Sequence, residues 1–282
     1  MKYLAIFRHK EKYPVKTMCA FFEVSRSGYY DFVKRMDKPD RDAPLGELIR
    51  ECQEKCGKIY GYRRVQIWLD RKKNVRRNPK TVLRVMQKYG LLSEIRRRKK
   101  YKVMSKQVHK YANALDRDFH ADRPNQKWVT DISYIHTGQG VLYLSMIRDL
   151  YDNSIVAFKT AAAQTVSLVL DTIRAARKKE TVTAELLLHS DQGFQYTSHG
   201  YFRLTQSYDI LPSMSRRGNC YDNAPAENFF SILKAECINR QKIKDFAMAK
   251  SLIADYIHFY NHERIQLKTK HTPLEWRRAF VA

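Results

Sequence analysis

Three acidic residues, each set in its own local pattern, constrain the fold of this chain more than any other feature. Asp131 lies inside the apolar, β-branched run Trp128–Tyr134, as it would in a buried strand. Asp191 closely follows the short apolar run Leu186–Leu188, which places it at the end of another strand. Glu227 comes soon after an Asn-Ala-Pro sequence, a typical helix start. We therefore expect a fold in which two strand-borne aspartates and one helix-borne glutamate meet.

Three converging carboxylates suit a hard cation, because Mg²⁺ takes oxygen ligands and often binds substrate phosphates as well. Two such ions about 3.5–4 Å apart stabilise the attacking and leaving oxygens of a phosphoryl transfer. Spacing alone is weak evidence in a chain with 29 acidic residues among 282, so the argument depends on the three local contexts. We expect Asp131, Asp191 and Glu227 to be both catalytic and metal-binding, with two Mg²⁺ ions as cofactor and Mn²⁺ as a substitute.

Two other acids compete for a place in this set. Asp149 ends an apolar run, where a carboxylate most often stabilises a turn. Asp222 lies just before the helix of Glu227, where we expect a cap or a support for the neighbouring loop. The ordinary alternative for Asp131, Asp191 and Glu227 is that they are surface acids, and the three motif contexts together argue against it.

At these residues the chain resembles the transposases of insertion-sequence-three-type elements, specifically the catalytic product of their second reading frame. The similar stretches are Trp128–Tyr134, His189–Gly193, Gly218–Lys234, Tyr260–Arg264 and Thr272–Trp276. The resemblance implies an α/β fold, a ribonuclease-H-like integrase core with a mixed five-stranded sheet flanked by helices, preceded by an all-α helix-turn-helix region. It also implies a circular intermediate and fusion to an upstream-frame partner by frameshifting.

The charge of the chain predicts a polyanionic partner. Lys and Arg number 53 against 29 Asp and Glu, a formal net charge of +24. No apolar run approaches the length of a membrane span, so double-stranded DNA is the expected partner rather than a membrane surface. The five cysteines are irregularly spaced, which favours reduced thiols and a cytoplasmic, nucleoid-associated protein. Cys52 and Cys56 are expected in a core rather than on zinc.

Helical periodicity, breakers and charge divide the chain into five parts. A small helix-turn-helix is expected over 1–36 and a polar linker over 37–44. A three-helix DNA-binding domain then occupies 45–95 and a basic linker 96–121. The catalytic core with a helical tail takes 122–282. Within the core, a strand near Glu185–His189 is expected to run parallel to the strand of Asp131.

Basic residues on the helical units and the linker are the expected DNA contacts. The ordinary alternative is that these basic residues only form the solvated faces of their helices. Lys234 is added because it lies seven residues, close to two helical turns, after Glu227 and so on the same face. The predicted contacts are Arg26, Lys80, Arg84, Lys88, Arg96, Arg97, Arg98, Lys99, Lys100 and Lys234.

The function expected from these features is that of a DNA transposase acting as a homo-oligomer on element ends and target DNA. Water would attack first to free a 3′-OH, and that hydroxyl would then attack a second phosphodiester in a direct transesterification. Two alternatives remain. One is a non-catalytic helix-turn-helix regulator with an integrase-like dimerisation domain, and the other is a ribonuclease-H-like nuclease.

Overall fold

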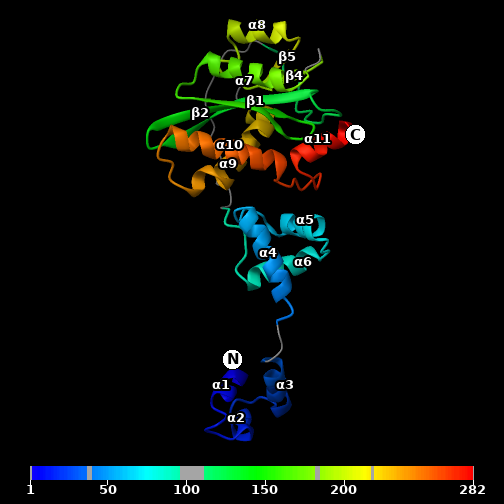
Figure 1. Ribbon diagram of the computed structural model, residues 1–282, viewed down its shortest axis with the longest axis vertical. Coiled ribbons are helices and arrows are strands. Elements are labelled where there is room, and N and C mark those ends of the chain that lie inside the picture. Colours follow the sequence, from blue (N-terminus) through cyan, green and yellow to red (C-terminus); the bar gives the residue numbers. More distant parts are fainter. Residues whose placement is uncertain (1, 37–39, 96–110, 182–184, 217–218, 282) are drawn as a thin grey trace.

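The computed structural model describes residues 2–36, 40–95, 111–181, 185–216 and 219–281. Two helical units are followed by a larger α/β core, and the C-terminus lies at the side of that core (Figure 1). Among the described residues, no helix is both long and apolar enough to cross a membrane.

The first helical unit contains α1 (Lys2–Arg8), α2 (Val15–Phe21) and α3 (Arg26–Met36). The expected helix-turn-helix is α2 and α3, and α1 is an addition that the sequence pattern did not predict. The turn between α2 and α3 holds Glu23 at a φ of 53°, in the left-handed region that glycine adopts most readily. The unit buries Ile6, Met18, Cys19 and Tyr29 between its helices.

The second helical unit is formed by α4 (Ala43–Lys55), α5 (Tyr62–Lys73) and α6 (Pro79–Lys88). Asn78 caps α6 as its sequence predicts, accepting a hydrogen bond from the Lys80 amide at 2.8 Å. Cys52 and Cys56 are buried in the core of this unit, as expected. Their neighbours there are Ile49, Val65, Leu69, Val82, Val85 and Met86.

Five strands form one mixed sheet in the order β3-β2-β1-β4-β5. The strands are β1 (Lys127–Thr137), β2 (Gly140–Asp149), β3 (Ile155–Ala161), β4 (Leu187–Ser190) and β5 (Leu211–Met214). The β1–β2 and β2–β3 pairs are antiparallel, whereas β1–β4 and β4–β5 are parallel. The parallel relation expected between the strands of Asp131 and Asp191 is confirmed.

Helices cover both faces of the sheet (Figure 1). On one face, α7 (Val166–Lys179) and α8 (His199–Ser207) pack on a cluster centred on Trp128 and Leu188. On the other, α9 (Ala224–Glu236) and α10 (Phe246–His262) enclose a cluster that includes Val129. Short 3₁₀ turns at Cys220–Asn223 and Ile238–Arg240 flank α9. The last described helix is α11 (Pro273–Val281).

The core and the second helical unit are joined by a loop that follows α10. Ile265 from this loop is 2% exposed and belongs to the hydrophobic cluster of α4, α5 and α6. The Tyr60 hydroxyl accepts a hydrogen bond from the Ile265 amide at 2.9 Å and donates one to the Glu263 carbonyl at 3.1 Å. Arg64 donates to the Ile265 carbonyl at 3.0 Å. The helical unit therefore completes its core with a residue from the catalytic half of the chain.

The base of this loop is held by a buried ion pair. Arg264 donates two hydrogen bonds to the Glu236 carboxylate, at 2.6 and 2.7 Å, and both side chains are 5% exposed. The Tyr256 hydroxyl donates a third hydrogen bond to Glu236 at 2.6 Å. Because α9 carries Glu236 and α10 carries Tyr256, the loop is tied to both helices that cover this face of the sheet.

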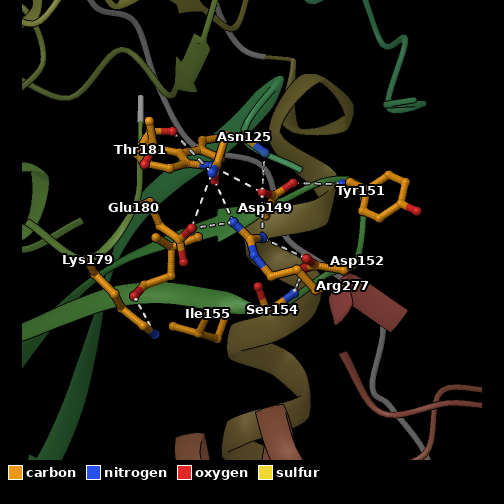
Figure 2. A network of polar contacts seen from close by, with 12 residues as sticks. Asn125, Asp149, Tyr151, Asp152, Ser154, Ile155, Lys179, Glu180, Thr181 and Arg277 are labelled. Atoms are coloured by element: carbon orange, nitrogen blue, oxygen red, sulfur yellow. Dashed lines mark hydrogen bonds and ion pairs between the residues drawn. The ribbon is translucent and has the colours of Figure 1, made fainter. Parts of the chain in front are cut away.

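Arg277 ties α11 to the sheet (Figure 2). Its guanidinium donates to Asp149 at 3.0 Å, to Asp152 at 2.7 Å and to Glu180 at 2.7 Å. Asp149 and Asp152 are fully buried, and burial raises the pKa of Asp149 to about 6, with a smaller contribution from the charge of Asp152. The Arg277 guanidinium is thus the counter-ion of three carboxylates, two of them fully buried.

Replacing Arg277 with Ala is expected to lower the free energy of unfolding by about 3–5 kcal/mol, because buried carboxylates would lose their counter-ion. Arg278→Ala is the matched control, since Arg278 is exposed on the same helix, and it should change stability by less than about 0.5 kcal/mol. Urea unfolding of the full chain measures both. Equal effects from the two variants would contradict a structural role for the network.

Candidate active site

Strand register brings two of the predicted catalytic acids together. The parallel pair β1–β4 aligns Val129 with His189. Asp131 and Asp191 each lie two residues further along, so they stand side by side where β4 ends. Both are half-buried. The pairing of β1 with β4 therefore positions these two carboxylates at the carboxyl-terminal end of β4.

Glu227 is delivered by the first turns of α9, as its sequence context predicts. The start of this helix is attached to β1, because the side-chain amide of Asn223 donates to the Thr130 carbonyl at 3.3 Å. Thr130 is the neighbour of Asp131 on the strand. Together with the apolar residues that α9 buries against the sheet, this hydrogen bond sets the helix of Glu227 beside the strand of Asp131.

The three carboxylates act on one another electrostatically. Burial raises the pKa of Asp131 well above its usual value, and the charges of Asp191 and then Glu227 raise it further. Burial also raises the pKa of Asp191, partly offset by a hydrogen bond from the Gly193 amide at 2.9 Å. Repulsion of this kind marks a site that gains from a bound cation.

All three groups are oxygen donors, so the donor set fits a hard divalent cation such as Mg²⁺. Across the described ranges, no three His, Cys, Asp or Glu side chains stand close enough to enclose an ion as they now lie. The Asp131 and Asp191 carboxylates each accept a hydrogen bond from a nearby backbone amide, Ile132 at 2.7 Å and Gly193 at 2.9 Å. Binding would therefore require these side chains to turn toward a common point.

Tyr196 is a site residue that the sequence analysis missed. It is 1% exposed, and its hydroxyl lies 3.4 Å from the Thr130 hydroxyl. Burial raises its pKa well above the usual value, with added contributions from the charges of Asp131 and Asp191. A neutral tyrosine thus lies close enough to the two aspartates to respond to their charges, and only its position five residues after Asp191 hinted at this in the sequence.

The two competing acids have supporting roles. Asp222 is fully buried and accepts hydrogen bonds from Arg117 at 2.8 Å and from the Arg216 amide at 2.9 Å. Burial alone would raise its pKa, but the ion pairs with Arg216 and Arg117 outweigh it and hold the pKa well below the usual value. Asp149 lies opposite Trp128 in the β1–β2 register, and Trp128 is three residues before Asp131 on β1. The Asp149 carboxylate accepts a hydrogen bond from Arg277, so it belongs to the Arg277 network.

Lys234 lies on α9 with Glu227 and faces the site. Its ammonium is 4.6 Å from the centre of the Tyr134 ring. Burial lowers the pKa of Lys234, and the negative charge of Asp131 opposes that shift. A lysine that responds to the charge of Asp131 is placed to meet a phosphate that approaches the carboxylates.

Four of the other predicted DNA contacts lie on the helical units, away from this cluster. Arg84 makes two 2.7 Å hydrogen bonds to Asp42, and Lys88 contacts Asp40 at 2.6 Å and Asp42 at 2.9 Å. These two basic residues therefore hold the start of α4 against α6. Lys80 is exposed at the start of α6, and Arg26 is exposed at the start of α3. Arg96, Arg97, Arg98, Lys99 and Lys100 lie outside the described residues.

Both halves of the chain match models of known protein families. Two models described as integrase core domain match residues 121–220 and 227–279, and an HTH-like domain matches residues 39–99. The chain is 36% identical to transposase InsK for insertion sequence element IS150 of Escherichia coli (strain K12), covering 95% of both proteins. It is 30% identical to transposase InsF for insertion sequence IS3A of the same organism, covering 91% of both.

Among solved structures, the catalytic core domain of HTLV-2 integrase in complex with magnesium resembles this chain. The TM-score is 0.45 at 13% sequence identity, over 56% of this chain and 99% of that domain.

The buried His189 predicts a pH-dependent stability. Burial lowers its pKa from 6.5 to about 4, against the opposing charge of Asp222. Its ring nitrogens lie 2.9 Å from the Ser213 hydroxyl and 3.1 Å from the Ser215 hydroxyl. Since the unfolded chain takes up this proton at a higher pH than the folded chain, stability falls as pH drops from 6.5 to about 4.

We expect His189 to account for about 3 kcal/mol of that fall, and His189→Gln to remove this part of the pH dependence. Urea unfolding at several pH values measures the slope. His199→Gln is the control, because His199 is exposed at the start of α8. A variant at position 189 with the wild-type slope would show that another group is responsible.

Proposed function

The chain belongs to the transposases of insertion sequence elements that carry an integrase core domain, and from this premise we propose that it is a polynucleotidyl transferase with a DDE active site of two aspartates and one glutamate. In this proposal it binds the ends of its element, nicks the DNA and joins the freed 3′-OH to target DNA. The observation that carries the proposal is the β1–β4 register, which sets Asp131 beside Asp191 next to the helix of Glu227.

Asp131, Asp191 and Glu227 would hold two Mg²⁺ ions, or Mn²⁺ in their place. When bound, such ions neutralise charge on the reacting phosphate and lower the pKa of a coordinated water or hydroxyl. The raised pKa values of Asp131 and Asp191 support this role, because a bound cation would stabilise the ionised carboxylates that burial disfavours and, at Asp131, would also offset the charges of Asp191 and Glu227.

The residues of the chain position and neutralise the substrate in this scheme. In the first step, water attacks the phosphorus and the bond to the 3′ oxygen breaks, leaving a 3′-OH and a 5′-phosphate. In the second, that 3′ oxygen attacks a target phosphorus, and a target 3′-OH leaves. Lys234, which lies within the field of Asp131, would bind a phosphate adjacent to the reacting one. The buried Tyr196, whose hydroxyl contacts Thr130, would help to hold the strand that carries Asp131.

The proposed partners are double-stranded DNA at element ends and target, and further copies of this chain on that DNA. We also propose a circular intermediate, fusion to an upstream-frame product and a place on the nucleoid in the cytoplasm. The second helical unit, with Lys80 exposed on α6, would read the element ends, and the first unit with Arg26 would add contacts. The basic run Arg96–Lys100 would bind phosphates without regard to sequence.

Asp131→Asn, Asp191→Asn and Glu227→Gln should each reduce nicking and strand transfer by at least about a hundredfold, since neutral amides are poor Mg²⁺ ligands. DNA binding and thermal stability should stay close to wild type. Cleavage and joining of labelled element-end DNA in Mg²⁺ measure this. Asp122→Asn is the matched control, because Asp122 is an exposed acid just before β1.

Full activity in any one triad variant would remove that residue from the site. A wild-type chain that binds DNA without cutting it would favour the regulator alternative. Cleavage confined to RNA–DNA hybrids would favour the nuclease alternative.

Lys80→Ala in the full chain should reduce the preference for element-end over random DNA, if Lys80 reads bases from α6. Lys178→Ala on α7 is the control, as an exposed lysine of the core. Fluorescence anisotropy at two salt concentrations separates the outcomes. Equal weakening on both DNAs, with a shallower salt dependence, would mean that Lys80 contacts phosphate only.

A further inference from the structure

The edge of β1 is open beyond the active site. β4 pairs with only Lys127, Trp128 and Val129 of β1. From Asp131 to Thr137, β1 pairs with β2 on one side, and within the described part of the chain no strand covers the other. The catalytic carboxylates therefore stand where an unpaired strand edge begins.

A groove of about 490 Å³ lies along this open edge. One wall is the end of β1 with Tyr134 and His136, and the other is Lys234 of α9 with the segment that leads to Lys242. The lining contains two lysines and a histidine and no carboxylate. In the sequence the groove starts three residues after Asp131, about 10 Å along a strand.

The far end of the groove is closed by a tight turn. The Gly138 amide donates to the Ile243 carbonyl at 2.8 Å. A Cβ atom on Gly138 would lie 2.6 Å from the Lys244 carbonyl oxygen, so only glycine lets these two segments approach this closely. The wall that carries Lys242 is thereby fixed to the β1–β2 turn.

Tyr134 presents an aromatic surface in this groove. It is 56% exposed, although it lies on the central strand of the sheet. The Lys234 ammonium lies 4.6 Å from its ring centre, and the His136 ring meets it edge-on at 5.6 Å. The ordinary explanation is a surface tyrosine that packs against its own lysine. Its position between the catalytic acids and an acid-free basic groove argues for a ligand with both a flat ring and a negative charge.

We propose that this groove binds one unpaired nucleotide of the DNA strand beside the reacting phosphodiester. The base stacks on Tyr134, and its phosphate lies between Lys234 and Lys242. A volume of about 490 Å³ is suited to a single nucleotide and not to a duplex. Stacking on an aromatic ring tolerates any base, so the site adds affinity without sequence preference. The inference rests on the proposed transposase activity and specifies how the DNA end is held open.

Binding of the full chain to two DNAs in EDTA, where cleavage is prevented, tests this subsite. One is a blunt duplex, and the other is the same duplex with a short unpaired tail. Fluorescence anisotropy should show tighter binding of the tailed duplex by the wild type. Tyr134→Ala should weaken the tailed complex about tenfold and leave the blunt complex unchanged, whereas Tyr134→Phe should keep the preference. Lys242→Ala should weaken the tailed complex more than Lys250→Ala, an exposed lysine on α10.

Phe202→Ala, at an exposed aromatic on α8, controls for general loss of aromatic surface and should keep the preference for the tail. Equal binding of both DNAs by the wild type, or equal loss on both with Tyr134→Ala, would overturn the subsite. If the wild type also cuts and joins DNA in Mg²⁺, the proposed function survives that result. If the wild type binds neither duplex, the transposase proposal and the subsite fail together.

Discussion

The parallel pairing of β1 with β4 is the constraint on which the candidate site depends. Three residue pairs fix the register, and a shift by one residue would turn the two aspartates to opposite faces of the sheet. Buried Trp128 and Leu188 on one face and Val129 on the other resist such a shift, because each would lose its apolar surroundings. The hydrophobic core and the arrangement of carboxylates therefore follow from the same strand alignment.

The sequence predicted those parts of the structure that local patterns control. The resemblance in Trp128–Tyr134 and His189–Gly193 is confirmed by the matched families. The structure confirms the mixed five-stranded sheet and the helix that begins just after Asn223. Strand and helix periodicity have strong local signatures, so such elements can be recognised without knowledge of their neighbours.

Contacts between distant segments were not predictable in the same way. Tyr196 contacts Thr130, which lies 66 residues earlier in the chain, and Arg277 joins three carboxylates from distant segments. The pairing of Arg84 with Asp42 spans 42 residues, and no local pattern in the sequence indicates it. A sequence does not distinguish a basic residue that forms an ion pair within the protein from one that binds a phosphate.

The insertion of Ile265 into the second helical unit has a consequence for engineering. A chimera that exchanged only residues 45–95 for those of a relative would bring a foreign hydrophobic pocket to this isoleucine. The relative's residues in place of Tyr60 and Arg64 would then have to fit the native loop that starts at Glu263. A transplant that included the loop after α10 would carry both sides of the contact. The exchangeable module of this protein is therefore discontinuous in sequence.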